Sequence, residues 1–460
     1  MKTKSLFLLN FLFSTMVFSQ VGSLDMSFVP ETSKYTNINT IAIQSDEKIL
    51  LGADAYIGQT VPISAVGRLN SNGSIDTSFN TGNGFKNFST FSIVEQANGK
   101  IIVGGWDNNS GVKNYLSRLN PNGSLDSSFN IGTGPNDIVR CVTLQPDGKI
   151  IIAGDFTLFN GEGANYLARL NADGSRDNTF NSLWGADNKI ISCIVLKSGK
   201  IIIKGLFTKY NGVVRNYIAR LNTDGSLDTS FIPEITINDF VSSNIVEDNS
   251  GDIIFAAGYS IDGIAKRRLI RFKNDGKLDK AFSLNNTTDL PIYKISIQVD
   301  QKILIGGDFS KYNEEQRSGF ARLNSDGSLD DTFIVGSGVN STISSIISSD
   351  NDNIIIAGGF STYNDFAISR IAKILTEDNL NSFDTEKSNI KIYPNPVRSK
   401  LFISENTVSD YEIFNIMGQK IISGKIDKNY IDVVNLQEGT YILNFKSKKG
   451  RTITEKFIKQ

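Results

Sequence analysis

The residues that most often perform enzyme chemistry are scarce in this chain of 460 residues. Histidine is absent, which excludes Ser-His-Asp and Cys-His catalysis, histidine general bases and histidine-ligated zinc. The sequence also has no P-loop, no CxxC pair, no GxSxG nucleophile elbow and no dinucleotide-binding glycine motif within a βαβ unit. We therefore expect the protein to use no cofactor and no metal ion.

Cys141 and Cys193 are the only cysteines. Cys141 lies eight residues before Lys149 and Cys193 lies seven residues before Lys200, and these two lysines open equivalent predicted strands. The cysteines are therefore one residue out of phase and should point to opposite faces of their strands. This favours two buried, free thiols over a disulfide.

Carboxylates are the remaining candidates for catalysis, because a pair of them can hydrolyse a glycosidic bond. Most acidic residues, however, recur in register in turns such as RLNSDGSLDDTF, residues 322–333. A catalytic acid should stand out from such a repeat, and none does so clearly. A glycoside hydrolase or lyase that uses carboxylates and tyrosine stays an alternative.

Two tryptophans are candidate ligand contacts because neither belongs to a repeated pattern. Trp184 lies in NSLWGADN, in the connection between two repeats, and Trp106 follows a predicted second strand. Connections of these two kinds emerge on one face, where indoles could stack on sugars or apolar side chains. Local loop packing would explain them equally well. Positions that align with Trp106 hold Asp155, Leu206, Asp308 and Gly359.

Three tyrosines belong to a motif that recurs after the second strand, Phe-x-x-(Tyr/Phe)-Asn. They are further candidate ligand contacts, although repetition favours a packing role that seals neighbouring repeats. These residues are Tyr210, Tyr312 and Tyr363.

The turn RLNxDGSLDxSF recurs at a nearly constant spacing of 50 or 51 residues. Its aspartate stands at Asp25, Asp76, Asp126, Asp177, Asp228, Asp279 and Asp330. A period near 50 indicates a propeller or a solenoid, in which each unit buries its faces against its neighbours.

The unit at residues 137–180 shows the strand pattern. A strand over 139–145, a turn at PDG, the apolar run KIIIAG, the alternating segment NYLARLN and a short strand ending at Phe180 predict four antiparallel strands. That is the composition of a propeller blade.

The offset between the ends of the repeat favours a closed ring over an open stack. Residues 22–28 form a lone fourth strand, whereas the last repeat stops after a third strand at 367–375. The first strand can therefore complete the last blade. We predict an all-β protein with a seven-bladed β-propeller of four-stranded repeats at residues 20–375.

Alternate oxygens in the repeated turn suggest a calcium loop as an alternative. Asn324, Asp326, Ser328 and Asp330 are the residues concerned in one copy. The glycine position and the missing bidentate glutamate do not match an EF-hand loop. Asx-turn chemistry explains the same residues without a metal.

The N-terminus has the pattern of a signal peptide. Lys2 and Lys4 precede an apolar stretch from Leu6 to Phe18 that is too short to span a bilayer. Small residues at Val17 and Ser19 predict cleavage after residue 19, so residues 1–19 are expected to direct export.

The motifs of the repeat resemble the delta-60 repeat family of bacterial extracytoplasmic proteins over residues 22–375. RLNxDGSLDxSF and DGKIIIxGxFxxYNG carry the resemblance. The resemblance implies a repeat fold and no particular chemistry.

Residues 389–460 have a different character, with 12 basic and 7 acidic residues against 33 and 41 in residues 20–388. A polar linker at 376–388 precedes alternating strands broken by glycine and proline turns, which predict a small Ig-like β-sandwich. An adhesive or carbohydrate-binding domain is one interpretation.

This segment resembles the C-terminal sorting domain of the type IX secretion system of Bacteroidetes. YPNP, IFNIMGQKI, LQEGTYIL and the terminal KFIKQ carry the resemblance. It implies the secretion machinery as a partner and passage across the outer membrane. The sorting residues it assigns are Tyr393, Pro394, Asn395, Pro396, Gly418, Gly439, Tyr441 and Lys456.

These features favour a secreted or cell-surface propeller that binds a glycan or a protein without catalysis. The carboxylate-dependent hydrolase or lyase and a structural role in the surface layer are the alternatives. We expect no nucleic-acid partner, since the net charge is only −1, and no transmembrane segment in the mature chain.

Overall fold

The computed structural model describes most of the chain after residue 20. The described ranges are 21–55, 64–107, 114–181, 184–233, 237–239, 244–261, 264–284, 286–349, 354–376, 392–404, 408–415, 420–426, 428–447 and 452–460. The predicted signal peptide and Gly418 lie outside them. The chain divides into two compact units, Met1–Leu380 and Asn381–Gln460, which we describe separately.

The first unit consists of antiparallel sheets, seven of them in the described residues, each built around three successive strands. The first strands are β1 (Ile38–Ile43), β4 (Phe88–Glu95), β7 (Val139–Leu144), β12 (Ile190–Val195), β17 (Ile237–Asp239) with β18 (Ile245–Glu247), β21 (Ile292–Ile297) and β26 (Ile343–Ser348). The second strands are β2 (Ile49–Ala53), β5 (Ile101–Asp107), β8 (Ile150–Gly154), β13 (Ile201–Gly205), β19 (Ile253–Ile261), β22 (Ile303–Gly307) and β27 (Ile354–Gly358). The third strands are β3 (Val66–Leu69), β6 (Leu116–Leu119), β11 (Leu167–Leu170), β16 (Ile218–Leu221), β20 (Ile264–Phe272), β25 (Phe320–Leu323) and β30 (Ile371–Ile374). We call each sheet a blade and number the blades in chain order.

The unbroken apolar runs occupy the centre of each blade. Every residue of β8, for example, is buried, because neighbouring blades cover both faces of the strand. The hydrophobic clusters lie between blades and not within them. One cluster joins Ile151 and Leu167 of blade three to Ile190 and Ile203 of blade four.

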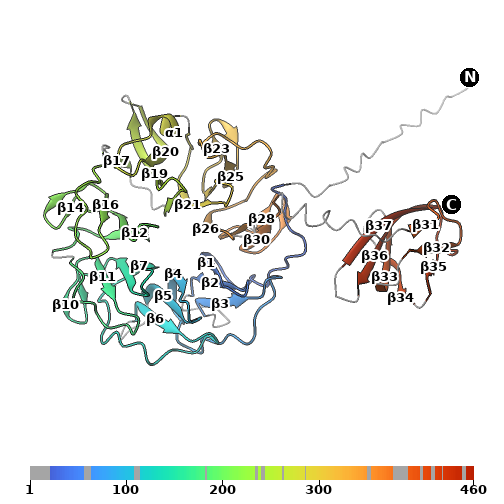
Figure 1. Ribbon diagram of the computed structural model, residues 1–460, viewed down its shortest axis with the longest axis horizontal. Helices are drawn as coiled ribbons and strands as arrows, with labels where there is room; N and C mark the ends of the chain where they lie inside the picture. Colours follow the sequence, from blue (N-terminus) through green and yellow to red (C-terminus); the bar gives the residue numbers. More distant parts are fainter. Residues whose placement is uncertain are drawn as a thin grey trace, which may run out of the picture. The chain divides into compact units, whose positions relative to one another are not determined.

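The first strands contact one another in a closed order, β1, β4, β7, β12, β18, β21, β26 and back to β1. The blades therefore form a ring, in which the blue first blade lies beside the orange last one (Figure 1). A hydrophobic cluster shared by Ile38, Leu51, Ile355 and Ile371 fills this last boundary. The first unit is a β-propeller.

Residues 21–25 lie along β30, the last strand of the ring. The Gly22 amide donates to the Leu375 carbonyl at 2.9 Å, and the Asp25 amide donates to the Lys373 carbonyl at 2.8 Å. Leu24 and Ile374 form an antiparallel bridge. The N-terminal segment thus occupies the place of the fourth strand in blade seven.

The fourth strand of each blade is shorter than the sequence pattern predicts. It is one bridged residue, as in the pair Leu170 and Arg176. Asp177 ends it, because its carboxylate accepts hydrogen bonds from the amide and the hydroxyl of Thr179 and turns the chain.

Short hairpins extend four blades beyond the second strand. They are β9 (Leu158–Phe159) with β10 (Glu162–Gly163), β14 (Lys209–Tyr210) with β15 (Val213–Val214), β23 (Lys311–Tyr312) with β24 (Glu315–Gln316), and β28 (Thr362–Tyr363) with β29 (Phe366–Ala367). Blade five differs, because β19 and β20 run on together to Ile261 and Ile264 and a short helix, α1 (Lys280–Leu284), follows its turn.

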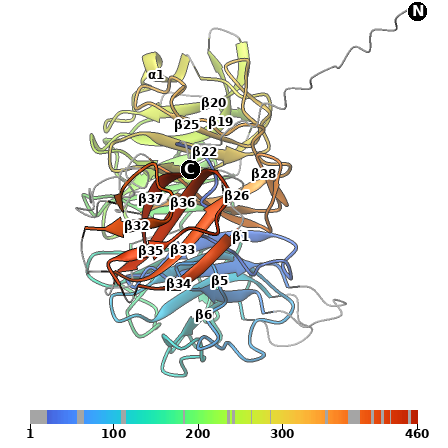
Figure 2. The same cartoon turned by 90° about the vertical axis from the view of Figure 1, so that its right-hand side faces the viewer.

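The second unit contains two antiparallel sheets around one core. One sheet has the order β31 (Ile392–Tyr393), β32 (Lys400–Ile403), β35 (Tyr430–Asp432). The other has the order β34 (Lys420–Lys425), β33 (Val408–Asn415), β36 (Gly439–Ser447), β37 (Thr452–Lys459), and Figure 2 shows these strands side by side. Leu401 and Ile403 of the first sheet pack with Leu443 and Phe445 of the second, so the unit is a β-sandwich. Its Ig-like topology stays a prediction.

Among the described residues, no helix is long and apolar enough to cross a membrane.

Candidate ligand-binding face

The repeated turn joins adjacent blades, as blade three shows. The guanidinium of Arg169 lies 2.7 Å from the Asp177 carboxylate, stacks over the Phe180 ring at 4.8 Å and donates to the Thr223 carbonyl of blade four at 2.6 Å. Lys149 approaches the same carboxylate at 2.7 Å. Although burial raises the pKa of Asp177, these partners hold it well below its usual range. The motif is structural.

The oxygens that suggested calcium are engaged within the turn itself. The Asp326 carboxylate accepts from the Ser328 amide at 2.9 Å and from its hydroxyl at 2.7 Å, while Asn324 donates to that hydroxyl at 2.9 Å. This is Asx-turn geometry. Among the described residues, no three His, Cys, Asp or Glu side chains group in a way that could hold a metal ion.

The three tyrosines proposed as ligand contacts are buried. Tyr210, Tyr312 and Tyr363 are each 0% exposed, and burial raises the pKa of all three hydroxyls. The Tyr210 hydroxyl donates to the Gly225 carbonyl at 2.8 Å, and the other two bond equivalent glycine carbonyls of the repeated turn. A side chain inside the core cannot stack on an external ligand, so we leave the tyrosines out of the proposed binding surface.

Among the residues that the structure describes, Trp184 is the most exposed large apolar side chain, at 72%. Its carbonyl accepts a hydrogen bond from Asn165 at 2.7 Å, and its indole lies against Gly212 at the tip of the β14–β15 hairpin. Val213 and Val214, next in that hairpin, are 44% and 60% exposed. Trp184 and this hairpin together expose three apolar side chains, and we call these three residues the Trp184 patch. Sequence reasoning missed the valines, although isoleucine, valine or leucine pairs are absent from the other three hairpins.

Trp106 is 38% exposed, at the end of β5 opposite Ser89 of β4. In an antiparallel blade, the end of the second strand and the start of the first strand share one edge. Trp184 precedes β12 and Trp106 ends β5, so both tryptophans lie on the same face of the propeller, though in different blades.

Carboxylates also gather on this face, each bonded to the first strand of its own blade. Asp155 lies between Arg140, at 2.5 Å, and Lys189, at 3.3 Å. Burial raises its pKa, but the two cations lower the pKa by more. An aspartate held ionised in this way is unsuited to donate a proton as a general acid.

Two equivalent aspartates are likewise engaged. The Asp308 carboxylate accepts from the Tyr293 hydroxyl at 2.9 Å, and the Asp54 carboxylate accepts from the Asn39 amide at 2.7 Å. The three carboxylates therefore repeat a structural position at the end of the second strand. A catalytic carboxylate should depart from the repeated pattern, and none of these three aspartates does so.

The cysteines are free, as predicted. They lie on neighbouring first strands, where the Cys141 thiol donates to the Cys193 carbonyl at 3.0 Å. Cys193 is buried and Cys141 is partly buried, and the thiol contact lowers the pKa of Cys141.

Two family profiles match the chain. The profile described as "Domain of unknown function (DUF5122) beta-propeller" matches residues 44–79, 96–129, 145–180, 196–231 and 298–333. The profile of the secretion system C-terminal sorting domain matches residues 391–460. The chain carries DUF5122 propeller repeats and a type IX sorting domain. Both resemblances noted in the sequence are confirmed. The sorting domain marks the chain for export to the cell surface or beyond.

The sorting domain's YPNP motif is bound to the last strand. Asn395 accepts a hydrogen bond from the Ile458 amide at 2.8 Å, and the peptide bonds before Pro394 and Pro396 are cis. Tyr393 is 51% exposed and stacks on Phe402 with ring centres 5.8 Å apart.

The remaining sorting residues that the structure describes belong to β36 and β37. Gly439 begins β36, and Tyr441 stacks on Phe457 while its hydroxyl donates to the Gln437 carbonyl at 2.9 Å. The backbone of Lys456 pairs with Ile442. These contacts hold the end of the chain in its sheet.

Solved structures match the chain at low identity. PorZ, a surface component of the type IX secretion system of Porphyromonas gingivalis, is 12% identical with a TM-score of 0.45, over 95% of this chain and 61% of its own. The extracellular domain of a putative one component system from B. thetaiotaomicron is 14% identical with a TM-score of 0.46, over 92% and 51%. This chain thus spans about half to three fifths of those two proteins.

A gluconolactonase from Xanthomonas campestris is 11% identical with a TM-score of 0.39, over 77% of this chain and 98% of its own. Similarity at this level supports no inference about activity. Among curated proteins, no match was found.

Proposed function

We propose that the propeller is a non-catalytic binding module, exported by the type IX system, whose ligand is a glycan or a protein of the cell surface or its surroundings. The observation that carries the proposal is the Trp184 patch. A 72% exposed indole near a hairpin with two exposed valines keeps apolar surface in water, which is costly unless a ligand covers it.

Such a patch suits a ligand with a flat apolar face. An indole offers a large contact area with little side-chain entropy to lose, and it stacks on the C–H face of a sugar or on an apolar peptide side chain. Trp106 on the same face offers a second, half-exposed ring. The engaged carboxylates Asp54, Asp155 and Asp308 support recognition over hydrolysis.

The test is a glycan and surface-protein binding screen with the purified full-length chain. Trp184→Ala and the double variant with Trp106→Ala should each weaken binding at least about tenfold, as loss of a central aromatic contact usually does. Leu125→Ala is the matched control, because Leu125 is 65% exposed at a repeated position away from this face. Turnover of a polysaccharide or peptide that Asp155→Asn abolishes would establish the enzyme alternative instead.

A further inference from the structure

Each of the first six blades places two cations on the aspartate of its repeated turn. A guanidinium nitrogen lies 2.6–2.8 Å from the carboxylate, and a lysine ammonium lies 2.7–3.2 Å from it. The arginines are Arg68, Arg118, Arg169, Arg220, Arg271 and Arg322. Each also stacks on a phenylalanine at 4.3–4.8 Å.

Blade seven departs from this pattern at its boundary with blade one, which we call the seam. Lys373 stands opposite Ile355 in β30, the position that an arginine holds in the other blades. Its ammonium lies 3.4 Å from Asp25, and it is the one described cation on that carboxylate. The position of the second lysine is Asn353 in the sequence and lies outside the described residues.

The contacts that an arginine would make at the seam are left open. In blades one to five the arginine donates to a carbonyl in the next blade's turn, for instance Arg68 to Pro121 at 2.7 Å and Arg271 to Ser325 at 2.8 Å. The equivalent acceptor at the seam is the Ser71 carbonyl. No described side chain donates to it, and no described cation lies over the equivalent ring, Phe28.

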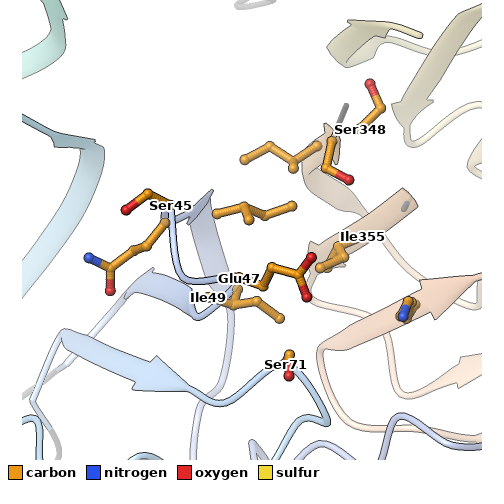
Figure 3. A pocket seen from close by; sticks show the side chains of 11 residues that line it. Ser45, Glu47, Ile49, Ser71, Ser348 and Ile355 are labelled. Carbon is orange, nitrogen blue, oxygen red and sulfur yellow. The ribbon is translucent and has the colours of Figure 1, made fainter. Parts of the chain in front are cut away.

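A pocket of 460 Å³ occupies this place, and Figure 3 shows Glu47 and Ser71 at its edge with Ile355 beside them. Lys373 forms part of the wall, and apolar side chains from both blades form the floor: Ile43, Ile49, Ile347 and Ile355. A hollow of 470 Å³ at the boundary of blades four and five has no such floor. It is lined by polar and charged residues, including Arg220, which donates to the Asn274 carbonyl.

Glu47 adds a carboxylate at a strained position of the seam pocket. It has a φ of 64°, where the equivalent turns of blades two to five use Gly99, Gly148, Gly199 and Gly251. Gln301 has the same position in blade six with a φ of 70°, so this turn accepts residues other than glycine, and at the seam the Glu47 side chain lines the pocket.

We propose that the seam pocket binds an alkylguanidinium group, the side chain of an arginine from outside the propeller. The methylene stem would lie on the isoleucines, and the guanidinium would donate to the Ser71 carbonyl and the Glu47 carboxylate. Lys373 keeps its ion pair with Asp25, the interaction that an arginine makes with the equivalent aspartate in the other blades. The pocket opens among the first-to-second and third-to-fourth strand turns, on the face opposite the Trp184 patch, so this inference is independent of the proposed function.

The test is a calorimetric or NMR titration of the full-length chain with N-acetyl-arginine amide, free L-arginine and N-acetyl-lysine amide. We expect saturable binding of the arginine compounds and at least about tenfold weaker binding of the lysine compound. Tighter binding of the blocked amide indicates an arginine within a polypeptide, and tighter binding of the free amino acid indicates a small-molecule ligand.

Two variants make the proposal specific. Lys373→Arg supplies the guanidinium from the chain itself, so it should weaken arginine binding at least about tenfold and raise the melting temperature. Glu47→Gln should weaken binding severalfold, whereas Glu162→Gln, an exposed carboxylate of the β9–β10 hairpin, should not. The proposal is overturned if the wild type shows no saturable binding up to about 10 mM, or if folded Lys373→Arg binds arginine undiminished. The Trp106→Ala/Trp184→Ala variant should keep arginine binding, which separates the two proposals.

Discussion

Arg169 and Thr223 lie 54 positions apart, yet a guanidinium nitrogen of the first donates to the carbonyl of the second at 2.6 Å. The same guanidinium is paired with Asp177 inside blade three. The side chain therefore couples the turn of one blade to the turn of the next, and its equivalents repeat that link in blades one, two, four and five.

Arg169→Leu should lower the free energy of unfolding by about 3 kcal/mol, because it leaves the buried Asp177 with one cation and breaks the link to blade four. Chemical denaturation followed by tryptophan fluorescence measures this. Arg176→Leu is the control, since Arg176 contacts exposed partners, the Glu162 carboxylate at 3.4 Å and the Gly163 carbonyl at 2.6 Å, and should change stability by less than about 1 kcal/mol. Equal effects of the two changes would contradict the coupling.

The buried aspartates should make the propeller sensitive to acid. Burial raises the pKa of Asp330, but hydrogen bonds from Thr332 and Lys302 and the charge of Arg322 lower it to about 2. The folded pKa is below the unfolded value, so this stabilisation is complete above about pH 4 and is lost as the pH falls toward 2. Melting temperatures between pH 6 and pH 2 should be level at first and then fall. In Asp330→Asn the fall should be shallower.

Lys204 should have the opposite pH dependence. It is fully buried where the other blades hold glycine or alanine, and burial lowers its pKa to about 7. The unfolded chain binds the proton more tightly, so stability should rise with pH from about 7 to about 10 and be independent of this group below that range. Lys204→Met should stabilise the protein at pH 7 and reduce the rise, while the exposed Lys209→Met should do neither.

Ring closure depends in part on one hydroxyl. Tyr363 donates to the Gly22 carbonyl, whereas Tyr210 donates to Gly225 within a single stretch of chain. Each Tyr→Phe change should cost about 1 kcal/mol of stability. Only Tyr363→Phe should also speed proteolytic removal of residues 21–28, which timed digestion and mass spectrometry would detect. Equal protection of that segment in both variants would show that the hydroxyl does not hold the closure.

The propeller repeats and the sorting domain could be predicted because their signals are visible along the chain itself. These signals are the alternation of apolar and polar residues in strands, the glycines of the turns and the recurrence of one motif about every 51 residues. The brevity of the fourth strand was not predictable, since the Asx turn at Asp177 ends it through a side-chain contact. Only the three-dimensional structure distinguishes the exposed aromatic candidates from the buried ones. Tyr210 and Trp184 are both aromatic residues near the β14–β15 hairpin, but the Tyr210 side chain is buried in the core and the Trp184 side chain is exposed on the surface.

The seam pocket was also beyond sequence reasoning, although its signal was present. Lys373 breaks the register of six arginines, but a lysine for an arginine reads as a conservative change. The consequence of having lysine at position 373 becomes visible only when the contacts of the arginine guanidinium groups in the other blades are known.

The bridge between Leu24 and Ile374 also sets an order of events during folding. The residues that complete the ring are made first, and the strand they pair with is made last of all the blades. Until residues 21–25 pair with it, β30 presents an unpaired edge, and such an edge can pair with another chain. An exported chain that emerges gradually must therefore keep its first segment available until the seventh blade has formed, which makes closure the slow, long-range step of assembly.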